Sequence, residues 1–354
     1  MATTEKSSPR KKISWDRLIP DEIINQCIAR VPLSSHGAMS LISKQIGSFI
    51  NGGEIFGTRS GLGIKETRIL VAIGYKEDGS AAEWYSLVKK FCNDDYVLRP
   101  VPSFPLINRK EALVAAGNRV FVLGPSDISS VEGGTYNKKI VSKTKAVHYG
   151  DEVTAVVDDK IYVFGGCSSE DSALSYLEIL DVSTNKLETL PIPEQDRALI
   201  PRSNSWRVVW NGVVYFIRRD DDCVVFDPKT RKLERKDDAS MGDRMYLTSC
   251  VIDNTIYTVG WECDIEYFDP ECRTWRAVKG IEKLAEFELF NTSLFNFNNS
   301  KLMVFHQRSP EEIWFTLISL EKRGIEMWGS VDSCNCGLKL EKPAIIRQLL
   351  SLEI

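Results

Sequence analysis

The stretch TAVVDDKIYVF at Thr154–Phe164 decides the fold class. β-branched and aromatic residues lie on both sides of the pair Asp158-Asp159. Aspartate tolerates the positive φ that a tight two-residue turn requires. Two short apolar runs joined by such a turn predict a β-hairpin.

Four further stretches share this design, with Gly-Asn, Asn-Gly, Asp-Asn and Asn-Asn pairs at the turn. The apolar residues that follow the five turns lie 41, 53, 42 and 46 residues apart, at Val120, Ile161, Val214, Ile256 and Leu302. Intervals of this size are typical of β-propeller blades. In three units an aspartate lies six residues before a further apolar or aromatic residue: Asp181, Asp227 and Asp269. This second recurring pattern predicts a second hairpin in each unit, and two hairpins make the four strands of a blade.

The two ends of the β region predict how the ring closes. Residues 67–354 number 288, or 48 for each of six blades, which agrees with the observed intervals. The first unit offers three strands, near Arg68–Tyr75, Glu83–Leu87 and Tyr96–Leu98, and lacks a fourth, while Leu350–Ile354 alternates like a strand. We expect this C-terminal segment to complete the first blade, because closure removes exposed sheet edges.

Residues 13–60 show a helical pattern instead. Pro20 suits the first turn of a helix, where its missing N–H is not needed. Apolar residues then recur at helical spacing: Ile23, Ile24, Cys27, Ile28 and Val31. Pro32 ends this helix and a second apolar set runs from Met39 to Ile50, so we expect two or three short helices. So small a unit buries little surface by itself, and its apolar faces should cover either the next domain or a partner.

Residues 1–12 are polar and basic. We expect them to form a disordered tail.

Two short motifs in the helical region resemble the F-box. They are Leu18–Glu22, LIPDE, and Ser40–Lys44, SLISK, although Ile19 stands where the family usually has leucine. The tract Gly57–Ser60, GTRS, is similar to the segment after the box in plant F-box/kelch-repeat proteins. The β units resemble kelch repeats: Gly165-Gly166 matches the kelch diglycine, and Trp275 and Trp328 match the late tryptophan.

This resemblance implies a mainly β fold, in which a six-bladed kelch-type β-propeller at 67–354 follows a small α-helical F-box at 13–60. It implies a non-catalytic role as substrate-receptor subunit of an SCF-type cullin–RING ubiquitin ligase. The F-box would dock a Skp-type adaptor, and through it a cullin, while the propeller holds an unidentified target protein. The implied adaptor-binding residues are Ile19, Pro20, Ile23, Ile24, Cys27, Ile28, Leu41 and Ile42.

The target-binding residues are expected in the loops that follow the second and fourth strands of each blade, because variable loops on a rigid scaffold usually carry recognition. Such loops are expected at 124–139, 165–176, 218–222 and 306–312. The candidate hydrogen-bonding residues there are Arg218, Arg219, Asp220, Asp221, Asp222 and Arg308. For any one of them, a solvated loop charge is the competing interpretation.

Composition and missing motifs argue against several other classes. The 45 Lys and Arg against 49 Asp and Glu give a net charge of −4, which argues against a nucleic-acid binder. No apolar run reaches membrane-span length, and no secretory signal is recognisable, so we expect no membrane role and a cytoplasmic or nuclear location. The nine cysteines form no CxxC pair, and only Cys334 and Cys336 lie close together. We expect no metal and no cofactor.

Two alternative functions stay open at this point. The first is a propeller enzyme acting on a small molecule, which would need a convergent polar cluster with perturbed pKa values in the central channel. With only three histidines, His36, His148 and His306, a clustered copper site has few ligands to draw on. The second is a kelch scaffold whose helical head is only a cap.

Overall fold

The computed structural model describes residues 19–75, 82–90, 95–105, 111–134, 136–144, 152–165, 176–201, 205–217, 223–236, 248–260, 264–284, 290–297 and 300–354. The chain divides into two compact units, residues 1–66 and 67–354. The expected tail at 1–12 lies outside the described residues.

The first unit contains four described helices, not two or three. They are α1 (Asp21–Ala29), α2 (Leu33–Met39), α3 (Lys44–Asn51) and α4 (Glu54–Gly61). Pro20 and Pro32 both stand at N-cap positions, because a fixed φ and a missing N–H suit a helix start. Ser43 caps α3 by accepting a hydrogen bond from the Ile46 N–H at 3.2 Å. The extra helix arises because the segment after Pro32 forms its own short helix instead of a connection.

A small apolar core holds these helices together. Its fully buried members are Ile28, Ala29, Phe49 and Ile55, with Ile24, Met39, Ile46, Ile50, Phe56 and Leu62 packed against them. α1 and α4 contribute to it from opposite ends of the unit's sequence. The core is therefore built from residues 24 to 62.

A buried arginine ties the polar ends of these helices to one another. Arg59 of α4 is 1% exposed, and its guanidinium donates to the backbone carbonyls of Ala29 and Val31 at 2.9 and 3.0 Å. It also pairs with Glu66 at 2.9 Å. The same Glu66 carboxylate accepts the Leu33 N–H at 3.0 Å, at the start of α2. Arg59 thus satisfies carbonyls that the end of α1 leaves open, and Glu66 does the same for a donor at the start of α2.

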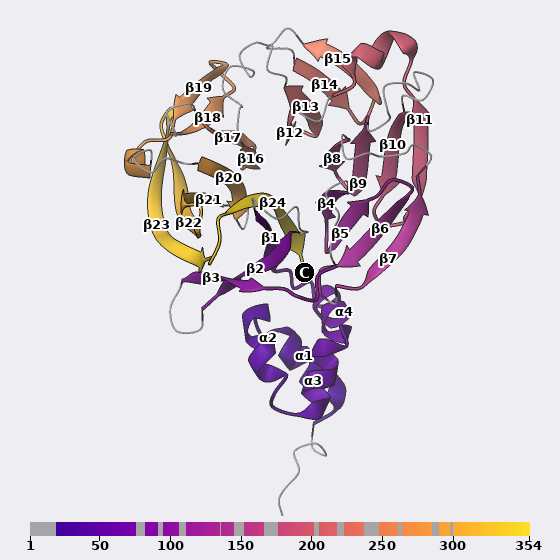
Figure 1. Ribbon diagram of the computed structural model, residues 1–354, viewed down its shortest axis with the longest axis vertical. Coiled ribbons are helices and arrows are strands. Elements are labelled where there is room, and N and C mark those ends of the chain that lie inside the picture. The colour runs from indigo at the N-terminus through magenta and orange to yellow at the C-terminus, as the bar shows by residue number, and fades with distance from the viewer. Residues whose placement is uncertain are drawn as a thin grey trace, which may run out of the picture. The chain divides into compact units, whose positions relative to one another are not determined.

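The second unit is a ring of six four-stranded antiparallel sheets, the six blades expected (Figure 1). Blade 1 is β24 (Ala344–Glu353), β1 (Thr67–Tyr75), β2 (Glu83–Lys89) and β3 (Tyr96–Pro100). Blade 2 is β4 (Ala112–Ala116), β5 (Arg119–Leu123), β6 (Asp127–Glu132) and β7 (Lys138–Lys143), and blade 3 is β8 (Val153–Val157), β9 (Lys160–Phe164), β10 (Tyr176–Asp181) and β11 (Leu187–Pro191). Blade 4 is β12 (Trp206–Trp210), β13 (Val213–Ile217), β14 (Cys223–Asp227) and β15 (Lys232–Lys236). Blade 5 is β16 (Ser249–Ile252), β17 (Thr255–Val259), β18 (Ile265–Asp269) and β19 (Thr274–Ala277), and blade 6 is β20 (Phe290–Phe297), β21 (Lys301–Ser309), β22 (Glu312–Arg323) and β23 (Glu326–Lys339).

The C-terminal strand closes the ring, as the sequence predicted. β24 pairs with β1 from Thr67↔Glu353 to Tyr75↔Ala344, and it is the innermost strand of blade 1 (Figure 1). It is longer than the expected Leu350–Ile354. Two bonds from this strand reach blade 2: the Glu353 N–H donates to the Gly117 carbonyl at 2.9 Å, and Gln348 Nε2 donates to the Leu113 carbonyl at 2.9 Å.

Apolar and aromatic side chains fill the space between neighbouring blades. Phe164 of blade 3 meets Phe216 and Phe226 of blade 4, each with ring centroids 5.0 Å apart. Trp275 packs on Phe268 at 5.2 Å, and Phe268 meets Trp210 of the preceding blade edge-on at 5.9 Å. Because each blade is covered on both faces, its middle strands are largely apolar, with a few buried polar residues such as Ser129 and Ser130 of β6, and the hairpin pattern becomes visible in the sequence.

The three aspartates expected to begin the second hairpins do start tight turns. Asp181 Oδ1 accepts the Thr184 N–H at 2.8 Å, Asp227 Oδ1 accepts the Lys229 N–H at 2.8 Å, and Asp269 Oδ1 accepts the Glu271 N–H at 3.0 Å. The hydroxyl of Ser183 and the groups of Thr184 lower the pKa of Asp181 to about 2. A folded-state pKa below the unfolded one means that this turn is favoured above pH 4 and weakens as the pH falls towards 2.

Gly133 lies where blade 2 meets the closing strand, and a side chain there has no room. A Cβ would lie 2.8 Å from Leu352 Cδ1 and 2.9 Å from the Asn118 carbonyl oxygen. We expect Gly133→Val to destabilise the propeller by about 2 kcal/mol through overpacking against backbone that cannot retreat. Urea unfolding followed by tryptophan fluorescence measures this loss. An unchanged midpoint would show that β24 can shift at no cost.

Candidate functional sites

Helix α1 has two apolar stripes, one that faces the core and one that is exposed. Ile24 and Ile28, four residues apart, face the core, where Ile28 is 4% exposed. Ile23 and Cys27, also four residues apart, are exposed, as are Ile19 and Pro20 just before the helix. The spacing of four places each pair on one side of the helix. The outward stripe is the one available to another molecule.

The turn between α2 and α3 exposes the most apolar surface of this unit. Leu41 is 86% exposed and Ile42 is 68% exposed. Neither joins the core that Met39 and Ile46 contact on either side. Large aliphatic side chains in water cost free energy, and adjacent exposed ones mark an interaction surface. We refer to Ile19, Pro20, Ile23, Cys27, Leu41 and Ile42 as the exposed apolar set.

Two of the eight implied adaptor-binding residues do not belong to this set. Ile28 is a correction: its side chain is buried against Phe49 and Ile55 and is not accessible to a partner. Ile24 is half-buried and packs on the same core. Helical spacing alone does not tell which stripe faces inward, since both stripes are apolar.

Of the expected target-binding residues, only Arg308 lies in the described part of the chain; Arg218, Arg219, Asp220, Asp221 and Asp222 lie outside it. Arg308 is exposed, and its guanidinium lies over the Trp314 ring at 3.8 Å and bonds Cys334 Sγ at 3.2 Å. It lies near the end of β21, not in a loop. These contacts hold Arg308 against its own blade.

Two of the expected loops are mostly strand. The segment 124–139 contains all of β6, and β21 and β22 continue through 306–312 with only Pro310 and Glu311 between them. The expected bounds were too wide here: the connections are 124–126, 133–137 and 310–311, and the residues between them continue the strands. The segments 165–176 and 218–222 lie almost wholly outside the described residues.

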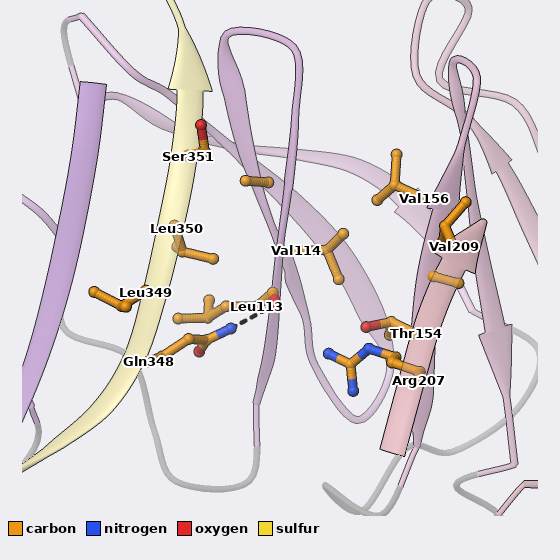
Figure 2. A pocket seen from close by; sticks show the side chains of 12 residues that line it. Leu113, Val114, Thr154, Val156, Arg207, Val209, Gln348, Leu349, Leu350 and Ser351 are labelled. Carbon is orange, nitrogen blue, oxygen red and sulfur yellow. Dashed lines mark hydrogen bonds between the residues drawn. The ribbon is translucent and has the colours of Figure 1, made fainter. Parts of the chain in front are cut away.

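The inner strands of blades 1 to 4 border an open pocket of about 340 Å³, which we call the central cavity. Figure 2 shows it between β24, β4, β8 and β12. Its lining is mostly aliphatic: Leu113, Val114, Ala115, Ala155, Val156, Val209, Leu349 and Leu350. Among the described residues, the polar lining side chains are Thr154, Gln348 and Ser351, and the charged one is Arg207. Gln348 is held by its bond to the Leu113 carbonyl, the dashed line in Figure 2.

Sequence reasoning missed Arg207 because target-binding residues were expected only in the loops between strands. The signal was present: a lone arginine in the apolar inner strand Trp206–Trp210, WRVVW. A charge at such a position has to face either a partner or a solvent-filled space.

The described histidines show no arrangement for acid–base catalysis. Burial lowers the pKa of His306 to about 4, and its Nε2 lies 3.3 Å from the Thr316 hydroxyl. His36 Nε2 lies 3.0 Å from the Val31 carbonyl inside the helical unit. His148 lies outside the described residues. Within the described ranges, no three His, Cys, Asp or Glu side chains are grouped closely enough to hold a metal ion.

The longest described helix, α1, has nine residues. No helix in the described ranges could therefore cross a bilayer.

Comparison with known proteins adds an independent line of evidence. The family model FKB95, Kelch-repeats domain, matches residues 84–338. The F-box/kelch-repeat protein At4g38940 of Arabidopsis thaliana is 28% identical over 355 residues, covering 93% of this chain and 93% of that protein. The F-box/kelch-repeat protein At4g39240 of the same plant is 30% identical over 356 residues, covering 96% of this chain and 92% of that protein. Both similarities span the helical unit and the propeller.

Proposed function

Because the chain belongs to the F-box/kelch-repeat protein family, we propose that it is the substrate-receptor subunit of an SCF-type cullin–RING ubiquitin ligase. In this role the helical unit binds a Skp-type adaptor, and through it a cullin, while the propeller binds a target protein. The chain supplies no catalytic group.

The observation that carries this proposal is the exposure of Leu41 and Ile42. They lie in the second of the two motifs that resemble the F-box, and the first motif contributes Ile19, Pro20 and Ile23 to the same exposed apolar set. Burying such side chains under a partner helix removes apolar surface from water, at about 1.5–3 kcal/mol for each fully buried side chain. The arrangement fits a protein-docking surface better than it fits a self-contained cap.

The mechanism that follows is proximity. A target held on the propeller is kept near a ubiquitin-charged conjugating enzyme carried by the same assembly, which raises the effective concentration of the target lysines. The receptor therefore needs one surface that binds the adaptor, a second surface that binds the target, and a stable fold that carries both. No proton transfer or covalent step falls to this chain.

The exposed turn offers the sharpest test of adaptor docking. We expect the double change Leu41→Asp/Ile42→Asp to weaken binding to a purified Skp-type adaptor at least a hundredfold. Two charges would replace two aliphatic side chains that the complex buries. Isothermal titration calorimetry on the full chain measures the loss. Since both side chains lie outside the core, circular dichroism and the unfolding midpoint should not change.

Gln45→Asp serves as the matched control, because Gln45 is an exposed polar residue in the first turn of α3. It should bind the adaptor like the unmodified chain. Equal affinity of the double variant and the control would refute the docking surface. A chain that never binds a Skp-type adaptor would refute the ligase role itself.

A further inference from the structure

The central cavity of the propeller contains a cation that has no partner among the residues that the structure describes. Arg207 projects from β12 into the space bordered by blades 1 to 4, on the side to which the Thr154 hydroxyl also points (Figure 2). Within the described part of the chain, no hydrogen bond or ion pair joins its guanidinium to another residue, and no carboxylate lines the cavity. The Arg207 side chain is exposed to the solvent of this pocket, so its charge is accessible to a group from outside.

Arg207 is accessible to an anion that enters the pocket. Its side chain is exposed there, although partial desolvation by the surrounding strands lowers the pKa of Arg207 from its usual value. Arginine stays protonated at neutral pH even so. An anion that enters can therefore pair with this guanidinium, and because the pocket is open to solvent the attraction should be sensitive to salt.

The shape of the site also restricts the ligand. A cavity of about 340 Å³ lies at the small end of ligand-binding pockets and suits a single side chain or a small acid. Its aliphatic walls would contact a methylene stem, while Thr154 and Arg207, which lie close together in Figure 2, offer hydrogen-bond donors to an oxygen-bearing head group. A carboxylate matches the planar fork of arginine with two parallel bonds.

We propose that this cavity is the target-recognition pocket of the propeller and that it receives an aspartate or glutamate side chain of the target, held by Arg207. That the bound protein is a ubiquitination target rests on the proposed function. The preference of the pocket for carboxylates is argued from the cavity alone. It identifies the substrate class as proteins with an exposed acidic segment.

An array of N-acetylated, C-amidated heptapeptides tests this assignment. The central residue is Asp, Glu, Asn or Gln and the flanking residues are random and neutral, so that the carboxylate is the single variable. Full-length chain should bind peptides with Asp or Glu at least tenfold better than their amide counterparts. The preference should weaken as salt is raised.

Three variants locate the effect. Arg207→Met should abolish the preference for acidic peptides, and Arg207→Lys should retain part of it, because lysine keeps the charge but loses the fork. Arg99→Met is the control, since Arg99 is an exposed arginine on β3, the outer strand of blade 1. It should behave like the unmodified chain. Loss of preference in Arg99→Met, or its survival in Arg207→Met, would overturn the proposal.

Small anions complete the design. Glutarate should compete with the acidic peptides, whereas binding of inorganic phosphate or free glutarate as tight as that of the best peptide would identify a small-anion site and overturn the peptide assignment. A chain that binds the adaptor but shows no acidic preference refutes this pocket and leaves the ligase role standing. A chain with the preference but no adaptor binding keeps the pocket and refutes the ligase role.

Discussion

Removing residues 342–354 is expected to unfold the propeller under conditions in which the full chain is stable. The deletion removes the whole of β24, which pairs with β1 over its entire length. It also removes Ala344, Leu350, Leu352 and Ile354, all less than 9% exposed. At about 1.5–3 kcal/mol for each large buried aliphatic side chain, the lost burial alone approaches the 5–15 kcal/mol that stabilise a typical domain.

The physical reason is that blade 1 joins both ends of the β region. Without β24, the inner edge of β1 is open, and the bonds from Glu353 and Gln348 to blade 2 are lost. An exposed edge strand then becomes a template for aggregation. Differential scanning calorimetry and light scattering should show a lost or much lowered transition together with soluble aggregates.

A point variant keeps this prediction testable if the truncated chain does not express. Leu352→Asp places a charge at a side chain that is 0% exposed, so it should lower the transition steeply. Lys342→Ala, in the exposed turn before β24, should leave it unchanged. A truncated chain that melts like the full one would mean that the ring is stable while open.

Replacing Arg59 is expected to unfold the helical unit while the propeller stays folded. Arg59→Met leaves the carbonyls of Ala29 and Val31 without their donor and the Glu66 carboxylate without its cation. Leaving buried carbonyl acceptors unpaired costs about 1–3 kcal/mol, and the lost ion pair adds less because the Glu66 side chain is 35% exposed. A unit of this size has a small core and little stability to lose.

Hydrogen exchange of the full chain, read by mass spectrometry, separates the two units. Peptides from 19–66 should lose protection in Arg59→Met, and peptides from the propeller strands should keep theirs. Arg30→Met is the control, because Arg30 is exposed and its guanidinium, among the described residues, donates to the Gln26 carbonyl of its own helix. Unchanged protection of 19–66 in Arg59→Met would show that the polar network contributes little to the helical unit. Adaptor binding should fall in Arg59→Met although Arg59 is 1% exposed and cannot touch a partner.

The local signals for hairpins and helix starts could be read directly. Asp158, Asn211 and Gly212 have positive φ in their turns, a requirement set by the turn itself and independent of distant residues. The apolar middle strands are visible for the same reason, since every blade needs them. Ring closure by the C-terminal strand followed from the number of strands, because the first blade had three at the start of the β region and needed one more.

Which side of an element faces a partner could not be read in the same way. Ile23 and Ile28 are the same residue type in the same helix, yet Ile23 is 48% exposed and Ile28 is 4% exposed. The difference arises only when Phe49 and Ile55 are brought against one side of α1. The tract that contains Arg59 resembled a family motif, but nothing in it showed that its guanidinium bonds carbonyls about thirty residues earlier.

The sequence by itself determined the repeating hairpins, the number of blades and the helical head, because turn chemistry and strand periodicity act over a few neighbouring residues. Only the tertiary structure decided which apolar side chains remain outside the helical core, and that Arg207 faces a shared cavity. These outcomes depend on residues far apart in the chain: the inner strands around Arg207 come from positions 112 to 353. Long-range packing, which local patterns do not encode, placed them around one space.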